Sequence, residues 1–567
     1  MLDERAASQV QELQAAGRPL DEALISAGGL SEEEILRRLA DELDLPYVQL
    51  EQRQPTPELL AGFPARTLLK HRLMPLEDEG DAVLLATSRV FDTTGVDELR
   101  LASGREFRIA LASSAEIERC INRCLGVGAD TVESLVADPE HGGIRVLDEE
   151  GEGTMDLAED AEDASIIRFV NQVLTEAIDR RATDVHFEPF EDVLRVRYRV
   201  DGVLQEANMP PHVRRFQAAI VSRLKILSHL DIAEKRRPQD GRIKLQVAGR
   251  EVDVRVSVIP MLHGEAVVLR LLDRSSALLG LANLGMSPED EAAFARALDI
   301  PHGIVLVTGP TGSGKTTTLY AALSRINDVE RKIITIEDPI EYHLRGINQI
   351  QVATKAGLTF ATGLRSILRH DPDVILVGEI RDLETAEIAV QASLTGHLVF
   401  STLHTNDAPG ALTRLVDMGV EPYLVASSLE AVLAQRLVRV ICPECRGEYA
   451  VDPASVEAEV LPDGAPPVLY RGKGCRACQG SGYMGRTGCF EMMGLTEQIG
   501  EAILTQKSTG QIRQMAIAQG MRTLRNDGWR HVLAGRTTVD EVLRVSKDER
   551  GNGAPAAPAR VDRGADS

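Results

Sequence analysis

The stretch that decides the fold runs from residue 303 to residue 327 and reads "GIVLVTGPTGSGKTTTLYAALSRIN". It opens with an apolar, β-branched run typical of a buried strand and closes with residues at helical spacing. Between them lies Gly-x-x-x-x-Gly-Lys-Thr, a pattern whose meaning depends on this strand, loop and helix context. A chance glycine-rich turn is the alternative, but it would not be expected between a buried strand and a helix. We therefore predict a loop that binds the phosphates of ATP or GTP.

The residues of this loop have separate expected roles. Glycines let the backbone curl so that several N–H groups face one anion, and the helix N-terminus adds its positive end. Lys315 is expected to neutralise the β- and γ-phosphates, and the Thr316 hydroxyl to bind Mg²⁺. The predicted nucleotide-binding residues are Gly309, Pro310, Thr311, Gly312, Ser313, Gly314, Lys315, Thr316 and Thr317.

Carboxylates follow two strand-like segments further along the chain. "DPDVILVGEIRD" ends its apolar run at Glu379, and "ITIEDPIEY" ends at Glu337 and Asp338. Ligands of parallel sheets bind at the carboxyl ends of strands, so these groups are expected beside the phosphates. Glu379 is predicted to polarise the attacking water or to hold the water shell of the metal. Glu337 and Asp338 are predicted to join that shell, although an isolated pair of this kind is usually a solvated turn.

Two histidines flank another strand in "GHLVFSTLHTND", His397 before it and His404 after it. A single histidine is more often a structural residue than a catalytic one. On a strand of this sheet, the pair is predicted to sense the γ-phosphate and to pass the signal on.

Four cysteines form two Cys-x-x-Cys pairs, "CPEC" and "CRAC", with 29 residues between them. Each pair can hold one tetrahedral ion from a tight turn, and four thiolates make a closed structural zinc site. A redox role is the alternative, but it would need only one pair. The predicted zinc ligands are Cys442, Cys445, Cys475 and Cys478; Cys489 lies outside the pattern.

Composition limits the other classes of function. The chain has 567 residues, of which 43% are hydrophobic and 26% charged, and no apolar run is long enough to span a bilayer. Its first residues are charged and have no signal-peptide core, which predicts a cytoplasmic location. A net charge of −23 argues against broad binding to nucleic acid.

The length predicts several domains, with an acidic passage between the first two. Between Arg145 and Arg168 there are nine acidic side chains and no basic one, which is typical of a solvated linker or, alternatively, of an acidic interaction segment. The expected parts are a first α/β unit (1–127), the acidic linker (128–163), a small α/β domain (164–284), a nucleotide domain with C-terminal helices (285–550) that includes the cysteine segment (440–490), and a disordered tail (551–567).

Taken in order, these motifs resemble the secretion ATPase superfamily, and specifically the assembly ATPases of bacterial type II secretion. The resemblance rests on "GPTGSGKTT", "ITIEDPIEY", "DPDVILVGEIRD", "TGHLVFSTLHTND" and the four cysteines, with "ATDVHFEP", "RRPQDGR" and "QRLVRVICPEC" as further matches. It implies a RecA-like ATPase core after a small PAS-like domain, and hydrolysis of ATP with Mg²⁺. Type IV pilus extension ATPases share most of these motifs and are the alternative. A DNA-translocating hexamer is disfavoured by the net charge, and a non-catalytic scaffold by the presence of Lys315 and Glu379.

The resemblance also implies a homohexamer whose sites are completed by arginines. The matching residues are Arg255, Arg270, Arg365 and Arg369, each of which would by itself be read as a surface ion-pair partner. The implied partners are the cytoplasmic domain of a bitopic inner-membrane protein, bound through residues 1–127, and a polytopic platform protein. The protein is thus expected at the inner membrane without spanning it. Some relatives bind cyclic di-GMP through an N-terminal pattern whose polar positions are not matched here.

Overall fold

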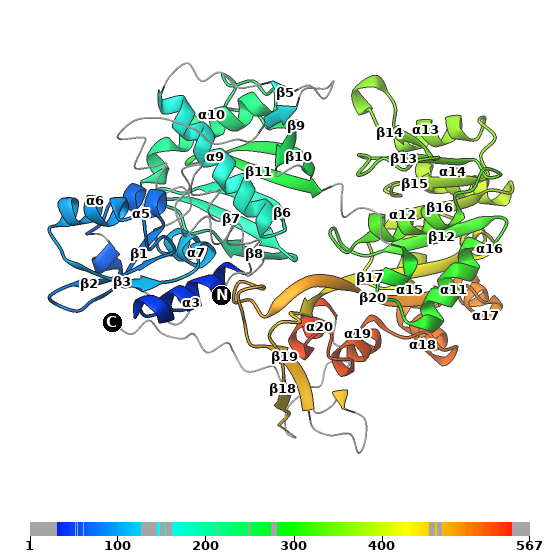
Figure 1. Ribbon diagram of the computed structural model, residues 1–567. Helices are drawn as coiled ribbons and strands as arrows, with labels where there is room; N and C mark the ends of the chain where they lie inside the picture. The colour runs from blue at the N-terminus through cyan, green and yellow to red at the C-terminus, as the bar shows by residue number, and fades with distance from the viewer. Residues whose placement is uncertain are drawn as a thin grey trace. The chain divides into compact units, whose positions relative to one another are not determined.

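The computed structural model describes residues 31–50, 53, 55–60, 62–125, 145–147, 153–154, 161–210, 212–247, 250–273, 280–452, 460–461 and 468–546 (Figure 1). The chain divides into two compact units, Met1–Arg274 and Ser275–Ser567. The helix expected before residue 30 and the tail expected after residue 550 lie outside the described residues. The boundary between the units falls ten residues before the one expected at 284.

The first part of unit 1 is a three-stranded sheet with helices packed around it. β1 and β2 are antiparallel, whereas β2 and β3 are parallel. Helix α3 begins after Ser31, whose side chain accepts from the Glu34 amide while Glu34 bonds back to Ser31. This reciprocal pair is a capping box, which fixes the start of the helix. The elements are α3 (Glu32–Leu43), α4 (Pro57–Leu60), α5 (Ala65–His71), β1 (Leu73–Asp78), β2 (Val83–Thr87), α6 (Thr94–Ser103), β3 (Phe107–Leu111) and α7 (Ser114–Leu125).

The second part of unit 1 is an eight-stranded antiparallel sheet in the order β5-β4-β9-β10-β11-β6-β7-β8. Alternate residues of its strands, such as Val254 and Val256, are buried with α9 and α10 in one core. This period of two is expected of strands that bury one face of their sheet. The elements are β4 (Arg145–Leu147), β5 (Gly153–Thr154), α9 (Ala161–Asp179), β6 (Ala182–Pro189), β7 (Leu194–Val200), β8 (Val203–Glu206), η1 (Val213–Phe216), α10 (Gln217–Leu227), β9 (Gln239–Val247), β10 (Arg250–Met261) and β11 (Gly264–Asp273).

The acidic passage contributes to this sheet. Strand β4 pairs antiparallel with β9, and β5 pairs with β4. The charge pattern had predicted a segment with little structure of its own, and it missed these two short strands at one side of the sheet. Main-chain hydrogen bonds to an existing sheet edge do not depend on side-chain hydrophobicity, so the pattern of side chains carried no signal for them.

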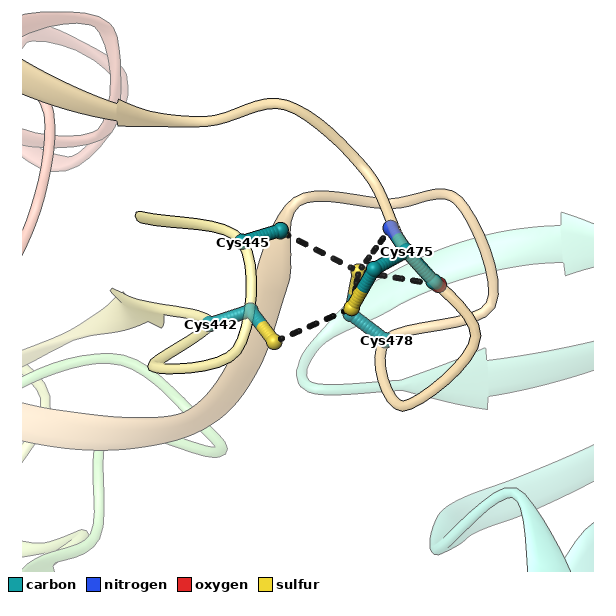
Figure 2. A group of neighbouring side chains, drawn as sticks. All are labelled: Cys442, Cys445, Cys475 and Cys478. Atoms are coloured by element: carbon teal, nitrogen blue, oxygen red, sulfur yellow. Dashed lines mark hydrogen bonds between the residues drawn. The ribbon is translucent and has the colours of Figure 1, made fainter. Parts of the chain in front are cut away.

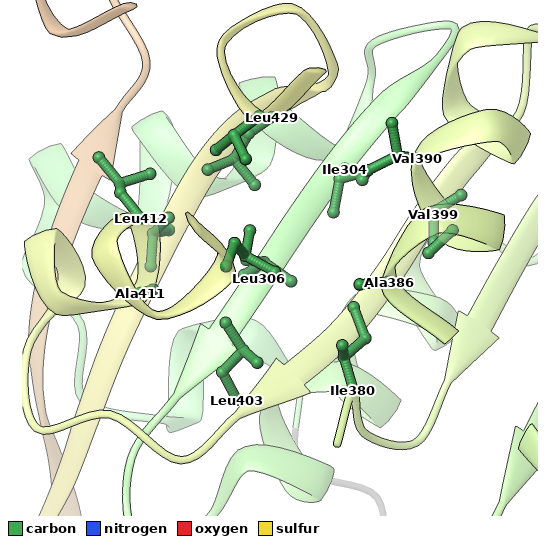
Figure 3. Packing of buried hydrophobic residues seen from close by; sticks show 14 of the residues in the cluster. Ile304, Leu306, Ile380, Ala386, Val390, Val399, Leu403, Ala411, Leu412 and Leu429 are labelled. Atoms are coloured by element: carbon green, nitrogen blue, oxygen red, sulfur yellow. The ribbon is translucent and has the colours of Figure 1, made fainter. Parts of the chain in front are cut away.

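Unit 2 is built on a seven-stranded sheet in the order β14-β13-β15-β16-β12-β17-β20, parallel except for β20. Strand β12 lies inside the sheet and is buried on both faces. Figure 3 shows Ile304 and Leu306 pointing from β12 towards Val390 of α14 and Leu412 of α15. The alternate residues of β12 pack with α11 and α12 in a separate core on the other face. Burial on both faces explains the continuous apolar run that predicted this strand.

The order of elements in unit 2 agrees with the predicted alternation of strands and helices. Four C-terminal helices follow the last strand, as expected after Thr496. The elements are η3 (Leu281–Asn283), α11 (Pro288–Leu298), β12 (Gly303–Thr308), α12 (Lys315–Ile326), β13 (Ile333–Glu337), β14 (Asn348–Gln351), η4 (Thr354–Ala356), α13 (Phe360–Ile367), β15 (Val374–Val377), α14 (Leu383–Leu394), β16 (Leu398–Leu403), α15 (Ala408–Asp417), α16 (Pro422–Ser428), β17 (Leu429–Ile441), β18 (Arg446–Ala450), β19 (Val468–Gly472), β20 (Tyr483–Gly494), α17 (Glu497–Leu504), α18 (Thr509–Ala518), α19 (Leu524–Leu533) and α20 (Val539–Val545).

Candidate active site

The predicted phosphate loop joins the end of β12 to the start of α12. Strand β12 pairs in parallel with β16 on one side and with β17 on the other. The ends of β15 and β16 therefore bring Glu379 and His404 to the same edge of the sheet. We call this region, formed by residues 309–317 with Glu379 and His404, the nucleotide edge.

Two glycines give the loop its shape. Gly309 has φ 152° and Gly314 has φ 87°, in the region that residues with a Cβ rarely adopt. A Cβ at Gly309 would stand 2.6 Å from the carbonyl oxygen of Gln435, and one at Gly314 would stand 2.8 Å from Nε2 of the same residue. Strand β17 therefore lies directly against the loop and leaves room for hydrogen atoms only.

Lys315 bonds to its own loop in this structure. Its ammonium donates to the carbonyl oxygens of Gly309 at 2.8 Å and Pro310 at 3.0 Å. Burial lowers the pKa of Lys315 to about 8, although the nearby Glu379 carboxylate acts to raise it. An anionic phosphate would stabilise the charged form of Lys315 more strongly than these neutral carbonyl oxygens do. The hydroxyl of Ser313 is buried in the same loop without a hydrogen-bond partner, so it is able to donate to a phosphate oxygen bound there.

Glu379 and His404 are in direct contact at the nucleotide edge. Nε2 of His404 lies 3.0 Å from Oε2 of Glu379, and Arg381 bonds to the other carboxylate oxygen. Burial acts to raise the pKa of Glu379, but the bonds from Arg381 and His404 outweigh it and hold the pKa below its usual value. The carboxylate is thus ionised at neutral pH and able to accept a proton or orient water.

Glu337 and Asp338 end strand β13 as expected, but their surroundings differ. Glu337 is buried, and its carboxylate accepts hydrogen bonds from Tyr320, from Thr335 at 2.6 Å and from Gln349 at 3.2 Å. These bonds tie α12 to β13 and β14. Asp338 is more exposed and lies 3.9 Å from Arg381, close to the Glu379 cluster. Asp338 is therefore the better placed of the two to reach a metal's water shell.

The structure places the two predicted histidines, His397 and His404, at opposite edges of the sheet. His397 precedes β16 and lies at the amino edge of the sheet, where Nδ1 bonds to the carbonyl oxygen of Ala392 at 2.8 Å. Six residues of strand separate it from His404, which is about 20 Å at the rise of an extended chain. The histidine before a strand and the one after it cannot meet at one edge, so only His404 stands at the phosphates of its own chain.

The four predicted arginines lie in both units. Arg365 and Arg369 are exposed on and just after α13; Arg365 pairs with Glu384 at 2.7 Å, and Arg369 bonds to the carbonyl oxygen of Arg365. In unit 1, Arg255 of β10 is directly opposite Arg270 of β11 in the sheet register. Opposed residues of antiparallel strands share a face, and Arg270 pairs there with Asp184 of β6 at 3.1 Å.

The residues that support the nucleotide edge from strand β17 were missed in the sequence. Oε1 of Gln435 accepts from the Thr318 hydroxyl of α12 at 2.7 Å. Arg436 is buried and donates to the carbonyl and side-chain oxygens of Asn406, both at 3.1 Å. Both residues lie in the stretch "QRLVRVICPEC" that contributes to the family resemblance, but nothing in that local pattern assigns them a place beside the phosphate loop.

The four predicted cysteines come together in unit 2 (Figure 2). One pair follows β17 and the other precedes β20, and the antiparallel hairpin β18–β19 lies between them in the chain. The Sγ–Sγ distances are 3.7 Å for Cys442–Cys475, 3.8 Å for Cys445–Cys478 and 3.7 Å for Cys475–Cys478. These exceed a disulfide bond, which is about 2 Å long. The thiols are free and converge on one point, as a tetrahedral metal site requires.

A phosphate loop after an inner parallel strand, with a carboxylate at the end of another parallel strand of the same sheet, defines a phosphate-loop nucleoside triphosphatase. A family model described as type II/IV secretion system protein matches residues 159–544, and a second, described as MshEN domain, matches residues 43–131. The chain belongs to the type II/IV secretion system protein family and is an ATP-hydrolysing enzyme of that family. This confirms the predicted resemblance and the predicted enzyme class.

Individual relatives extend the match to most of the chain. The type II secretion system protein E of Pseudomonas aeruginosa is 52% identical over 78% of this chain and 91% of its own length. The type IV pilus assembly ATPase PilB of Myxococcus xanthus is 43% identical over 95% of this chain and 96% of its own. The solved structure of the Yersinia pseudotuberculosis ATPase DotB shares the fold, with a TM-score of 0.50 and 20% identity over 72% of this chain and 99% of its own. Within the described part of the chain, no helix combines the length and apolar character that crossing a membrane requires.

Proposed function

We propose that this protein is the ATPase motor that drives pseudopilus assembly and protein export in type II secretion. The observation that carries the proposal is the 52% identity with a type II secretion system protein E over 91% of that relative's length. The nucleotide edge supports it, because Lys315, Glu379 and His404 supply a phosphate ligand, an ionised carboxylate and a group that orients it.

In the proposed reaction, each residue acts on a separate part of the substrate. Lys315 leaves the carbonyl oxygens of its own loop and neutralises the phosphates. Glu379 accepts a hydrogen bond from the attacking water, and His404 with Arg381 keeps the carboxylate turned towards it. Glu337 holds α12 in place by accepting a hydrogen bond from the Tyr320 hydroxyl. Magnesium fits the oxygen donors of Thr316 and Asp338 and would neutralise charge on the phosphates when bound.

We propose a homohexamer, because the family resemblance implies active sites completed by arginines, and Arg365 and Arg369 are exposed. Arg365 and Arg369 are available to stabilise the charge of a transferring phosphoryl group, together with Arg255 and Arg270 of unit 1. In the proposed hexamer, such residues complete the active sites across subunit boundaries. Isolated subunits are thus expected to hydrolyse ATP slowly.

A structural zinc ion fits the four thiols. A tetrahedron with zinc–sulfur bonds of about 2.3 Å has sulfur–sulfur edges of about 3.8 Å. The Sγ–Sγ distances of 3.7 to 3.8 Å match that edge without rearrangement. Main-chain N–H groups of Cys475 and Gly482 lie 3.1 and 3.2 Å from Sγ of Cys478, as suits a thiolate.

We further propose a cytoplasmic protein held at the inner membrane by partners. The candidate docking part is the first domain, expected at 1–127, bound to the cytoplasmic domain of a bitopic secretion-platform protein, with a polytopic platform protein as a second contact. Deleting residues 1–127 should leave nucleotide binding intact and release the protein from membranes. Strong flotation of the purified protein with anionic liposomes alone would contradict this.

Type IV pilus extension is the second candidate, since PilB of Myxococcus xanthus matches 95% of the chain. The test is deletion of the gene in its host, followed by complementation with the parent sequence or with Lys315→Ala. Type II secretion predicts that exported enzymes remain in the periplasm and that only the parent sequence restores export. Loss of surface pili with normal export would favour the second candidate, and hydrolysis of ATP by Lys315→Ala at the parent rate would contradict both.

A further inference from the structure

The loop between β16 and α15, residues 404–407, touches the catalytic carboxylate and the phosphate loop at once. His404 contacts Glu379, and the amide of Thr405 donates to Oγ1 of Thr308 at 2.9 Å. Thr308 directly precedes Gly309, the first glycine of the phosphate loop. A displacement of this loop would therefore disturb both the contact that orients Glu379 and the strand end that leads into the phosphate loop.

The other end of the same loop is held by the C-terminal helices. Asp407 caps α15 by accepting from the Gly410 amide at 2.8 Å, and its second oxygen pairs with Arg513 of α18. The next residue, Ala408, donates its amide to Oε1 of Glu491 at 2.7 Å. The loop thus connects the nucleotide edge to α18, because residues at both of its ends make these contacts.

Glu491 joins two helices through one buried carboxylate. It lies on β20 and is 2% exposed. Oε1 bonds to the first residue of α15, and Oε2 accepts from the amide of Leu524, the first residue of α19, at 3.3 Å. If α19 shifts relative to the sheet, one of these bonds must lengthen or the start of α15 must follow. Thr413 of α15 and Thr509 of α18 add a second link, with their hydroxyls 2.8 Å apart.

We propose that Glu491 and Arg513 are positioning residues for ATP hydrolysis. They fix the start of α15 and so hold His404 against Glu379, which makes the geometry of the hydrolytic site depend on helices α18 and α19. The inference rests on the proposed role of Glu379 at the nucleotide edge. It assigns the C-terminal helices a part in the reaction, through the contacts of Arg513 with Asp407 and of Leu524 with Glu491.

A merely structural role makes a different prediction. Losing these contacts would then lower the temperature of unfolding and leave turnover by the folded protein unchanged. Positioning instead predicts a lower kcat at nearly constant nucleotide affinity, because Lys315 and the loop amides still bind the phosphates.

The test uses the full-length protein with Glu491→Gln and Arg513→Gln. Glutamine keeps the shape of Glu491, but its amide offers one acceptor oxygen for two helix N–H groups. Arg522→Gln is the matched control, since Arg522 also links the C-terminal helices to the domain, through Glu289 and Asp290, and bonds to no residue of 404–408. The measurements are kcat, KM, ATP affinity and the unfolding temperature.

We expect Glu491→Gln and Arg513→Gln to lower kcat about tenfold or more, with ATP affinity changed less than about twofold. Arg513→Lys keeps the ion pair and should recover most of the loss. Arg522→Gln should lower the unfolding temperature and keep kcat. If Glu491→Gln does not fold, the two Arg513 variants decide the matter.

A kcat in both variants equal to that of Arg522→Gln would overturn the inference, and so would a raised KM at unchanged kcat. Glu379→Gln, measured in parallel, distinguishes a failure of the positioning role from a failure of the proposed hydrolytic site. Full turnover by Glu379→Gln would refute the proposed site, whereas inactivity of Glu379→Gln with normal kcat in the Glu491 and Arg513 variants would refute only the positioning role.

Discussion

The nucleotide edge and the four-cysteine site are both formed by residues at strand ends, but they are assembled differently. The nucleotide edge collects groups that follow three separate strands, β12, β15 and β16, and Glu379 and His404 are 25 residues apart. The cysteine site consists of two short pairs, each of which is already shaped by its own turn. The nucleotide edge depends on the register of a parallel sheet. The four-cysteine site depends on the spacing within each cysteine pair and on a single contact between the two turns that hold them. A change at one region should therefore impair chemistry, and a change at the other should impair folding.

The largest expected effect is on turnover at the nucleotide edge. Glu379→Gln removes the ionised carboxylate and keeps its shape, so hydrolysis should fall by about 10²- to 10⁴-fold while ATP binding is retained. Single-turnover hydrolysis and equilibrium binding of a labelled ATP analogue measure the two quantities. The unfolding temperature should stay within a few degrees of the parent value. Parent-level hydrolysis would mean that another group acts on the water.

The cysteine site should show the opposite result. Cys475→Ser removes one of four thiolates, so the variant should lose its metal and much of the folding free energy that metal binding supplies, which is about 10 kcal/mol or more for structural zinc. Metal analysis should find about one zinc per parent chain. Calorimetry with and without a chelator should show a destabilised C-terminal region. A metal-free protein of unchanged stability would be inconsistent with a structural site, and Cys124→Ser, at a half-buried cysteine in unit 1, is the control.

The two histidines of β16 sharpen the comparison within one strand. His404→Ala removes a bond to an ionised carboxylate, which is worth about 1.5–3 kcal/mol, so kcat should fall about 10- to 100-fold. His397→Ala, at the amino edge, should change kcat less than about twofold. Steady-state hydrolysis at saturating ATP measures both. A larger loss for His397 than for His404 would show that the site is completed from a part of the sheet other than the nucleotide edge.

The smallest expected effect is a pH dependence of stability from Glu491. Burial raises the pKa of Glu491 to about 7 from its ordinary 4.5, while the Ala408 amide and Arg513 act to lower it and Asp407 acts to raise it. Between these values the folded protein keeps a proton that the unfolded chain has released. The free energy of unfolding should therefore fall as pH rises from about 4.5 to about 7. Denaturant titrations should show a shallower slope for Glu491→Gln, and an identical slope would contradict this assignment.

Much of the architecture could be predicted from local pattern. The run at 303–308 and the segments at 333–337, 374–377 and 398–403 are apolar because both faces of each strand are buried, so the strands were recognisable one by one. The capping box at Ser31 and the two cysteine pairs were likewise readable within a few residues. Strands β4 and β5 were not, since edge pairing leaves no side-chain signal.

The sequence by itself determined which residue types stand at the phosphate loop, after the strands and at the metal pairs, because each of those motifs is complete within about ten residues. Only the tertiary structure decided which of them meet. Strand register placed His404 at Glu379 and His397 at the far edge, and long-range packing brought Arg436 and Glu491 to the loop between β16 and α15. A hydrogen bond between residues 83 positions apart, such as Ala408 and Glu491, depends on the whole sheet, and no local pattern encodes it.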